Sequence, residues 1–234
     1  MPLAAGTRSA NHVLAALPPS DFRRLARGLE PVNLQFGHVL CEAGETIRHV
    51  YFPLDSMVSL LADAGKGETL EVGLVGREGM VGTPLALGSP TSPVQELVQG
   101  TGKALRMPAK RFMAEIARSP KLRRLVDRAI FVGMSTAMQI AACNKSHLLE
   151  ARLARWLLMV RDRLTADSFY LTQDFLARML GVRRAGVNEG ASALQDRSLI
   201  RYARGRIFIL DLAGLTAAAC HCYRVIRKLE KNRN

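Results

Sequence analysis

The chain has 234 residues, of which 48% are hydrophobic and 23% charged, a balance typical of a globular protein with one large domain or two small ones. Its net charge of +13 indicates a polyanionic partner. No apolar run approaches the roughly 20 residues that cross a bilayer, and the start contains no export signal, so we expect no membrane partner and a cytoplasmic location.

The first half of the chain reads as short β-strands without intervening helices. Eight runs separated by turn residues are VNLQF, HVLCE, HVYF, MVSLLA, TLEVGLV, MVG, QELVQ and KALRM. Many short strands at regular spacing indicate an antiparallel sandwich or barrel, and about eight fit a jelly roll. A short helix over Pro19–Leu29, capped by Ser20, precedes them. The predicted fold class is α+β, with an N-terminal antiparallel β jelly roll at residues 1–118.

From Pro120 the apolar pattern becomes helical. Spacings of four and three residues form a heptad seam, which buries itself best against its own copy. We therefore expect residues 119–146 to form the dimerisation helix of a homodimer, with the interface at Val126, Ile130, Gly133, Ala137, Ile140 and Asn144. A second seam leaves the register open and runs through Leu122, Val126, Ala129, Gly133, Thr136, Ile140 and Cys143. Packing of the helix on its own domain is the alternative.

Residues 147–234 are the more basic part of the chain and have the pattern of a winged helix-turn-helix. This part holds 16 Lys and Arg against 8 Asp and Glu, and residues 178–206 hold 7 Arg against 2 acids. An amphipathic helix with Trp156 as a core anchor comes first. The next helix opens at Thr172, whose hydroxyl caps free N–H groups, and ends at Gly181, where glycine permits a sharp turn.

The second helix of the motif carries the candidate DNA contacts. It buries Val187, Ala191 and Leu194 at i, i+4 and i+7. The groups expected on its other side, within reach of base edges and phosphates, are Arg183, Arg184, Gly186, Asn188 and Glu189. The groups better placed for phosphates are Thr172, Gln173, Arg204 and Arg206. The strands Leu199–Tyr202 and Arg206–Leu210 form the wing, and Asp211 caps a last helix through Lys231.

This order of parts resembles the Crp/Fnr transcription regulators from about Asn11 to Arg227. The most specific stretch is EARLARWLLMVRDRL followed by LTQDFLARMLGVRRAGVNEGASALQDRSLIRYARGRIFILD. The resemblance implies a prokaryotic, cytoplasmic homodimer that binds a two-fold symmetric operator in double-stranded DNA and recruits or blocks RNA polymerase. The alternative is a ligand-binding or protein-interaction module whose winged helix docks on a protein rather than on DNA.

The resemblance implies that the jelly roll at residues 1–118 is a sensor domain, but it is weaker there. Relatives that bind cyclic nucleotides cradle the phosphate with a Gly-Glu pair and an Arg-Ser/Thr-Ala triplet, whose matching positions here are Gly82–Thr83 and Thr91–Ser92–Pro93. Both charged residues are missing, and a charge-assisted pair of this kind contributes about 1.5–3 kcal/mol. We therefore expect an unknown effector and weak or no binding of cyclic AMP. The candidate effector-pocket residues are Arg77, Glu78, Gly82, Thr83, Thr91 and Ser92.

No cofactor and no metal is predicted. Iron–sulfur relatives carry several cysteines near the N-terminus, whereas Cys41 is alone in the first 142 residues. Cys220 and Cys222 lie at i and i+2 of the predicted last helix, so their side chains would point about 200° apart, which is poor chelation geometry. A haem site using His38, His49 or His147 stays open. The sequence has no metal-ligand cluster, nucleophile motif or Gly-rich phosphate loop, so we expect no enzyme.

Overall fold

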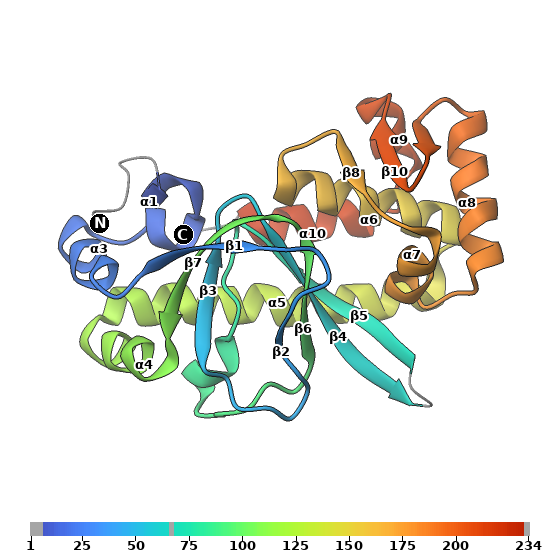
Figure 1. Ribbon diagram of the computed structural model, residues 1–234. Helices are drawn as coiled ribbons and strands as arrows, with labels where there is room; N and C mark the ends of the chain where they lie inside the picture. Colours follow the sequence, from blue (N-terminus) through green and yellow to red (C-terminus); the bar gives the residue numbers. More distant parts are fainter. Residues whose placement is uncertain (1–6, 66–67, 232–234) are drawn as a thin grey trace. The chain divides into compact units, whose positions relative to one another are not determined.

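The computed structural model describes residues 7–65 and 68–231 (Figure 1). The chain forms two compact units, one from Met1–Leu61 with Gly73–Met134 and the other from Ala62–Val72 with Ser135–Asn234. This division differs from the expected boundaries 1–118, 119–146 and 147–234 in two ways. The long helix is shared between the units, and the end of one β-hairpin belongs to the C-terminal unit. Residues Ala62–Val72 group with the C-terminal unit although they are distant from it in the sequence, so a division into consecutive segments cannot include them.

The N-terminal unit contains the predicted antiparallel β-fold. Its strands pair in two sheets, in the orders β1-β7-β3 and β2-β6-β4-β5. They are β1 (Glu30–Leu34), β2 (Val39–Cys41), β3 (His49–Pro53), β4 (Met57–Gly65), β5 (Glu68–Val75), β6 (Gln95–Gly100) and β7 (Gly102–Pro108). Of the eight expected runs, MVG forms only an isolated bridge between Val81 and Tyr51. Instead, the short helix η1 (Thr83–Leu87) begins soon after it.

Apolar side chains from paired strands and a following helix form the core of this unit. Phe52 on β3 lies opposite Leu105 on β7, and both are fully buried. Phe112 on α4 (Ala109–Arg118) meets Phe52 edge to face, with 6.4 Å between the ring centroids. Such a pair adds about 0.5–1.5 kcal/mol beyond the area that it buries. The helix that leads out of the β-fold is thereby anchored on it.

The helices before the β-fold differ from the expectation. The predicted helix Pro19–Leu29 is α3 (Pro19–Ala26), and its cap position is Pro18 without a side-chain hydrogen bond, so the assignment of Ser20 as a cap was wrong. Two short helices that sequence reasoning missed precede it, α1 (Thr7–Ala10) and α2 (His12–Ala15). Asn11 is fully buried and caps α2 by accepting from the backbone N–H groups of Val13 and Leu14.

A single helix, α5 (Pro120–Ser146), extends over 27 residues and confirms the predicted long helix. Its predicted dimer seam is wrong at two positions, because Val126 and Ile140 are buried within the chain itself. Val126 belongs to the core of the N-terminal unit, and Ile130 packs partly against that core. By length and composition alone, α5 is the one helix in the described part of the chain that is long and apolar enough to cross a membrane. A helix that pairs with another chain meets the same two criteria.

The C-terminal unit is built around α6 (Leu149–Leu164), in which Trp156 is buried as predicted. The Trp156 indole N–H donates to Glu71 Oε1 at 2.7 Å, which ties the end of the β4–β5 hairpin to this helix. The remaining elements are β8 (Ser168–Tyr170), α7 (Gln173–Leu180), α8 (Arg184–Asp196), β9 (Ile200–Ala203), β10 (Arg206–Ile209), α9 (Leu212–Ala218) and α10 (Cys222–Lys231). The wing is a three-stranded sheet in the order β8-β10-β9, whereas the sequence predicted two strands.

The predicted last helix from Asp211 to Lys231 is two helices. Asp211 caps α9, with its carboxylate accepting from the Gly214 N–H at 2.9 Å, but Ala219 is extended and α10 begins only at Cys222. The stretch contains no proline or glycine at the break. The interruption allows Cys220 and Cys222 both to be buried, whereas on a continuous helix their side chains would point in nearly opposite directions.

A carboxyl group is buried in the β-fold of the N-terminal unit. Glu96 on β6 is 2% exposed, and its Oε2 atom has no hydrogen-bond partner among the described residues. Burial raises the pKa of Glu96 to about 7, and hydrogen bonds from the Ser92 side chain and the Gly82 backbone oppose the shift. The folded chain therefore holds a proton there at a pH where an unfolded chain has released it.

This proton predicts a pH dependence of stability. Between about pH 4.5 and about 7 the folded state alone binds the proton, so the free energy of unfolding should fall as pH rises through this window, by on the order of 3 kcal/mol. Urea unfolding of the wild type and of Glu96→Gln at pH 5 and pH 7.5 measures it. The variant should lose this part of the slope. Parallel pH curves for the two proteins would show that Glu96 is charged in the fold.

Candidate nucleic-acid interface

The two helices of the predicted motif are α7 and α8, with the expected boundaries. The Thr172 hydroxyl accepts from the Phe175 N–H at 3.2 Å and satisfies one of the free donors at the start of α7. Gly181 ends α7 with a φ of 62°, in the left-handed region that glycine adopts without strain. The residue Arg183 then precedes α8 in an extended conformation, so the chain turns sharply between the helices.

The buried face of α8 explains its two glycines. Val187, Ala191 and Leu194 are buried as predicted. A Cβ atom on Gly186 would lie 3.1 Å from Leu149 of α6, and one on Gly190 would lie 3.7 Å from both Leu149 and Leu153. Gly186 was expected to point outward with the arginines, and this is wrong, because its Cα faces α6. The glycines instead permit the two helices to lie close together.

The outward face of α8 carries polar groups connected by hydrogen bonds. Arg183, Arg184, Asn188 and Glu189 are all exposed. The side chain of Gln173, at the start of α7, donates to Asn188 Oδ1 at 3.1 Å and accepts from Arg184 Nε at 3.2 Å. Asp174 lies 3.6 Å from the same Arg184 nitrogen. The structure thus brings Gln173, Arg184 and Asn188 together as one outward-facing group.

The wing places further cations on the surface. Arg204 and Gly205 have φ angles of 50° and 73°, as in a two-residue hairpin turn that follows the twist of the strands. Arg204 and Arg206 are exposed there, as expected of phosphate contacts. Sequence reasoning missed Arg201 on β9, whose guanidinium carbon lies 4.3 Å from the centroid of the Phe208 ring on β10. The sequence signal that could have identified Arg201 is its position opposite Phe208 in the hairpin.

These groups have the chemistry to read DNA. An arginine fork can donate two hydrogen bonds to guanine O6 and N7, an asparagine can pair with adenine, and Glu189 can accept from the amino group of cytosine. The arginines of the wing and Thr172 suit phosphate oxygens, which fix position and affinity but carry little sequence information.

The candidate effector-pocket residues fall into two groups. Gly82 and Ser92 both contact the buried carboxyl group of Glu96, and Thr83 and Thr91 are their neighbours in the chain. Arg77 and Glu78 belong to a separate turn, where the Arg77 carbonyl accepts from the backbone N–H of His12 in α2 and Glu78 accepts from the Gly76 N–H. Glu96 was not predicted, because nothing in the sequence distinguishes it from an exposed glutamate on a strand.

Comparison with protein families gives two matches. The description "Cyclic nucleotide-binding domain" matches residues 31–119, and "Crp-like helix-turn-helix domain" matches residues 151–218. Together they cover most of the β-fold and the whole helix-turn-helix with its wing. The comparison with curated proteins finds no match.

Solved structures share this fold over most of the chain. A transcriptional regulator of the CRP/FNR family from Thermus thermophilus superimposes with a TM-score of 0.67 at 23% identity, covering 81% of this chain and 98% of its own. The c-di-GMP-responsive global regulator CLP from Xanthomonas campestris gives 0.67 at 15% identity, covering 83% and 100%. FixK2 from Bradyrhizobium japonicum gives 0.66 at 11% identity, covering 82% and 98%. With both domains matched in the family's order, the chain belongs to the Crp/Fnr family of transcription regulators.

Proposed function

We propose that this chain binds a two-fold symmetric operator in double-stranded DNA as a homodimer, and recruits or blocks RNA polymerase there. The observation that carries the proposal is the outward face of α8, where Arg184, Asn188 and Gln173 form one polar group beside a basic wing. Membership of a family of transcription regulators supports a cytoplasmic location and a role other than that of an enzyme.

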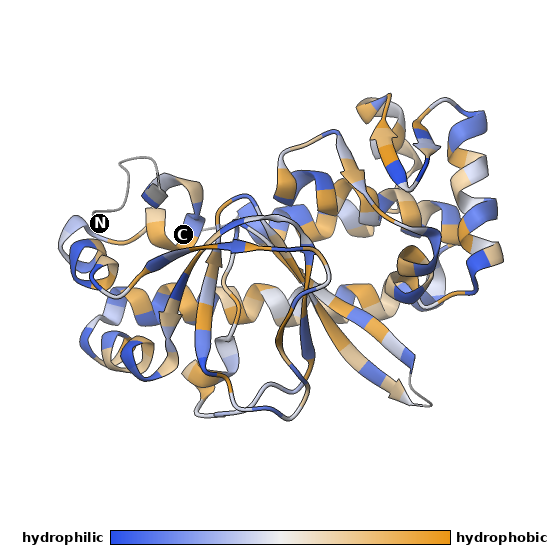
Figure 2. Cartoon of the chain, in the orientation of Figure 1, coloured by the Kyte–Doolittle hydropathy of each residue, from blue (hydrophilic) through white to orange (hydrophobic). Residues whose placement is uncertain are grey.

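The proposed dimer contact lies on a different face of α5 from the one that the heptad pattern indicated. Phe131, Met134 and Met138 are 49%, 53% and 66% exposed, and with Ala141 they recur at spacings of three, four and three residues. This stripe is rotated about 100° around the helix from the predicted seam, since each residue advances by about 100°. Figure 2 shows the apolar character of much of α5. Exposed apolar stripes of this spacing are buried in coiled-coil pairs.

A parallel pair of such helices would give the dimer two copies of α8. Dimeric helix-turn-helix proteins place their two recognition helices about 34 Å apart, one turn of B-DNA. The operator is therefore proposed to consist of two inverted half-sites in successive major grooves.

The buried Glu96 supports a sensor domain that does not respond to cyclic AMP. Its carboxyl group occupies the place between Gly82 and Ser92, the two elements that match the phosphate cradle of cyclic-nucleotide-binding relatives. A cyclic phosphate there would meet a carboxyl group in place of a guanidinium, with repulsion whenever Glu96 is ionised.

Among the predictions of the proposed function, the first concerns sequence readout. Arg184→Ala should lower affinity for the cognate operator by roughly 10–100-fold while changing affinity for random duplex much less, because a bidentate arginine–guanine contact contributes about 1–3 kcal/mol of discrimination. Fluorescence anisotropy with both duplexes measures this, and the exposed Arg118→Ala serves as the control. Unchanged discrimination in Arg184→Ala would remove this residue from the readout face.

The same assay tests DNA binding against docking on a protein. Affinity for random duplex should fall steeply with salt as phosphate contacts release counterions. If the winged helix docks on a protein instead, the chain will neither be retained on heparin nor shift random duplex at low salt.

The dimer face gives a second prediction. Met138→Glu should convert the dimer to a monomer and weaken operator binding, because it places a charge in the middle of an apolar seam. Sedimentation equilibrium measures the mass. Met113→Glu changes a methionine that is exposed on α4, outside the stripe, and should remain dimeric. A dimeric Met138→Glu protein would exclude this stripe as the contact.

Titration calorimetry tests the sensor domain. Cyclic AMP added to the wild type at pH 7.5 should produce no saturable heat up to millimolar concentration, since the cradle lacks its cation. A dissociation constant in the micromolar range would overturn this part of the proposal and leave DNA binding unaffected.

A further inference from the structure

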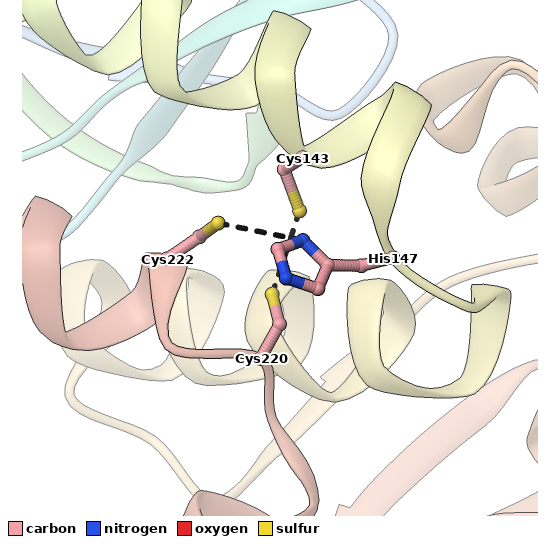
Figure 3. A group of neighbouring side chains, drawn as sticks. All are labelled: Cys143, His147, Cys220 and Cys222. Atoms are coloured by element: carbon pink, nitrogen blue, oxygen red, sulfur yellow. Dashed lines mark hydrogen bonds between the residues drawn. The ribbon is translucent and has the colours of Figure 1, made fainter.

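Four side chains of the kinds that can bind a metal ion lie close together in the C-terminal unit (Figure 3). Cys143, His147, Cys220 and Cys222 each offer one ligand atom, and the four atoms all lie within 4.8 Å of one another. Cys143 and His147 are one helical turn apart at the end of α5, where the His147 N–H donates to the Cys143 carbonyl at 3.1 Å. Cys220 lies in the break between α9 and α10, and Cys222 is the first residue of α10. Because the helix is broken here, the sulfurs of Cys220 and Cys222 both lie near Cys143 and His147.

The distances match a tetrahedral metal site. Around zinc, Zn–S bonds of about 2.3 Å and Zn–N bonds of about 2.0–2.1 Å place two sulfurs about 3.8 Å apart, and a sulfur and a nitrogen about 3.6 Å apart. In the structure the Cys143 and Cys220 sulfurs are 3.4 Å apart, and Cys222 Sγ is 3.6 Å from His147 Nδ1. These two separations are within a few tenths of an ångström of the tetrahedral values, and all four ligand atoms lie within 4.8 Å of one another.

The three cysteines of the site are shielded from solvent. All three cysteines are buried, and His147 is half-buried among them. The Gln139 side chain donates to Cys222 Sγ at 3.1 Å, a contact of the kind that orients metal-bound thiolates. Three thiolates and one imidazole fill four positions, which is the arrangement of structural zinc sites rather than catalytic ones.

A buried cation nearby lacks a counter-charge. Arg155 is 2% exposed, and its Nε atom has no hydrogen-bond partner in the described part of the chain, while Nη1 contacts the Met159 sulfur. The Arg155 charge interacts with the Cys143 thiol. Fully buried charges are normally paired. Three thiolates with a divalent cation carry a net charge of −1, which would balance Arg155.

We propose that Cys143, His147, Cys220 and Cys222 bind one zinc ion per chain, in a structural site that fastens the end of α5 to the start of α10. On binding, each thiol releases its proton to solvent and its sulfur coordinates the ion, so metal affinity should fall with falling pH. None of the four ligands is among the proposed DNA contacts or in the proposed dimer stripe. The prediction of no metal assumed one continuous helix through Cys220 and Cys222.

The competing chemistry is a disulfide. Cys143 and Cys220 would form it by losing two protons and two electrons to an oxidant such as molecular oxygen, and Cys222 and His147 would take no part in it. A closed thiolate site with a fourth nitrogen ligand favours the metal, and mass spectrometry distinguishes the two.

The experiment uses the full chain, expressed with zinc supplementation and purified under reducing conditions. Elemental analysis should give one zinc per chain. Replacement with Co²⁺ should give the visible d–d absorption of tetrahedral cobalt and a sulfur-to-cobalt charge-transfer band. Removal of zinc with a strong chelator should lower the Tm by at least about 5 °C, because the ligand stabilises only the folded state.

Variants assign the ligands. Cys222→Ser and His147→Ala should each lose the bound zinc and the charge-transfer spectrum, or reduce metal affinity by at least tenfold. The matched controls are Cys41→Ser, the cysteine outside the cluster, and His221→Ala, whose exposed ring lies 5.1 Å from that of His147. Both controls should retain one zinc.

Two results would overturn the proposal without relying on any variant that fails to fold. One is wild-type protein that holds less than a tenth of an equivalent of zinc and shows no cobalt spectrum on titration. The other is a Cys143–Cys220 disulfide peptide as the main species after anaerobic purification.

Discussion

The burial of α6 on all sides holds the C-terminal unit together. Every residue from Arg152 to Val160 is buried. Helix α8 packs closely against α6 at Gly186 and Gly190. The Trp156–Glu71 hydrogen bond joins the β4–β5 hairpin to α6, and the Cys220 N–H donates to the Ala151 carbonyl. A helix with no solvent face normally contains only apolar residues, but this one contains three buried arginines. Arg163 is paired with Glu230 at 2.6 Å, whereas Arg155 lies beside the cysteines.

The sequence predicted those parts of the fold that depend on local chemistry. The helix-turn-helix boundaries follow from a capping threonine and a glycine with positive φ, both of which act within a few residues. The family was inferred from the order of parts, with this stretch as the most specific portion, and it is confirmed. Which face of α5 is buried within the chain was not predictable in this way. Two apolar faces of α5, separated by about 100° around the helix, both follow a heptad spacing. Only the tertiary structure shows that the face with Val126 is the one that packs in the core.

The metal-ligand cluster and the buried Glu96 were beyond sequence reasoning for a related reason. Cys143 and Cys220 are 77 residues apart, and they meet because the chain breaks at Ala219 without proline or glycine. Local helix propensity does not predict a break at an alanine, so tertiary packing must impose it. Glu96 stands between Gln95 and Leu97, where the strand has no polar–apolar alternation to assign its side, and its burial depends on the sheet that β6 joins. In both cases the chemistry arises from residues that only the complete fold brings together.

The Gln173 side chain has a consequence for the entropy of recognition. Because it bonds both Asn188 and Arg184, it restricts two side chains that would otherwise sample many rotamers on an exposed helix face. Each such side chain loses about 0.5–1.5 kcal/mol of conformational freedom when a partner immobilises it. In this chain part of that loss occurs on folding rather than on binding. In the proposed DNA complex, Gln173 would therefore influence which sequences are bound by setting how ordered Arg184 and Asn188 are before binding.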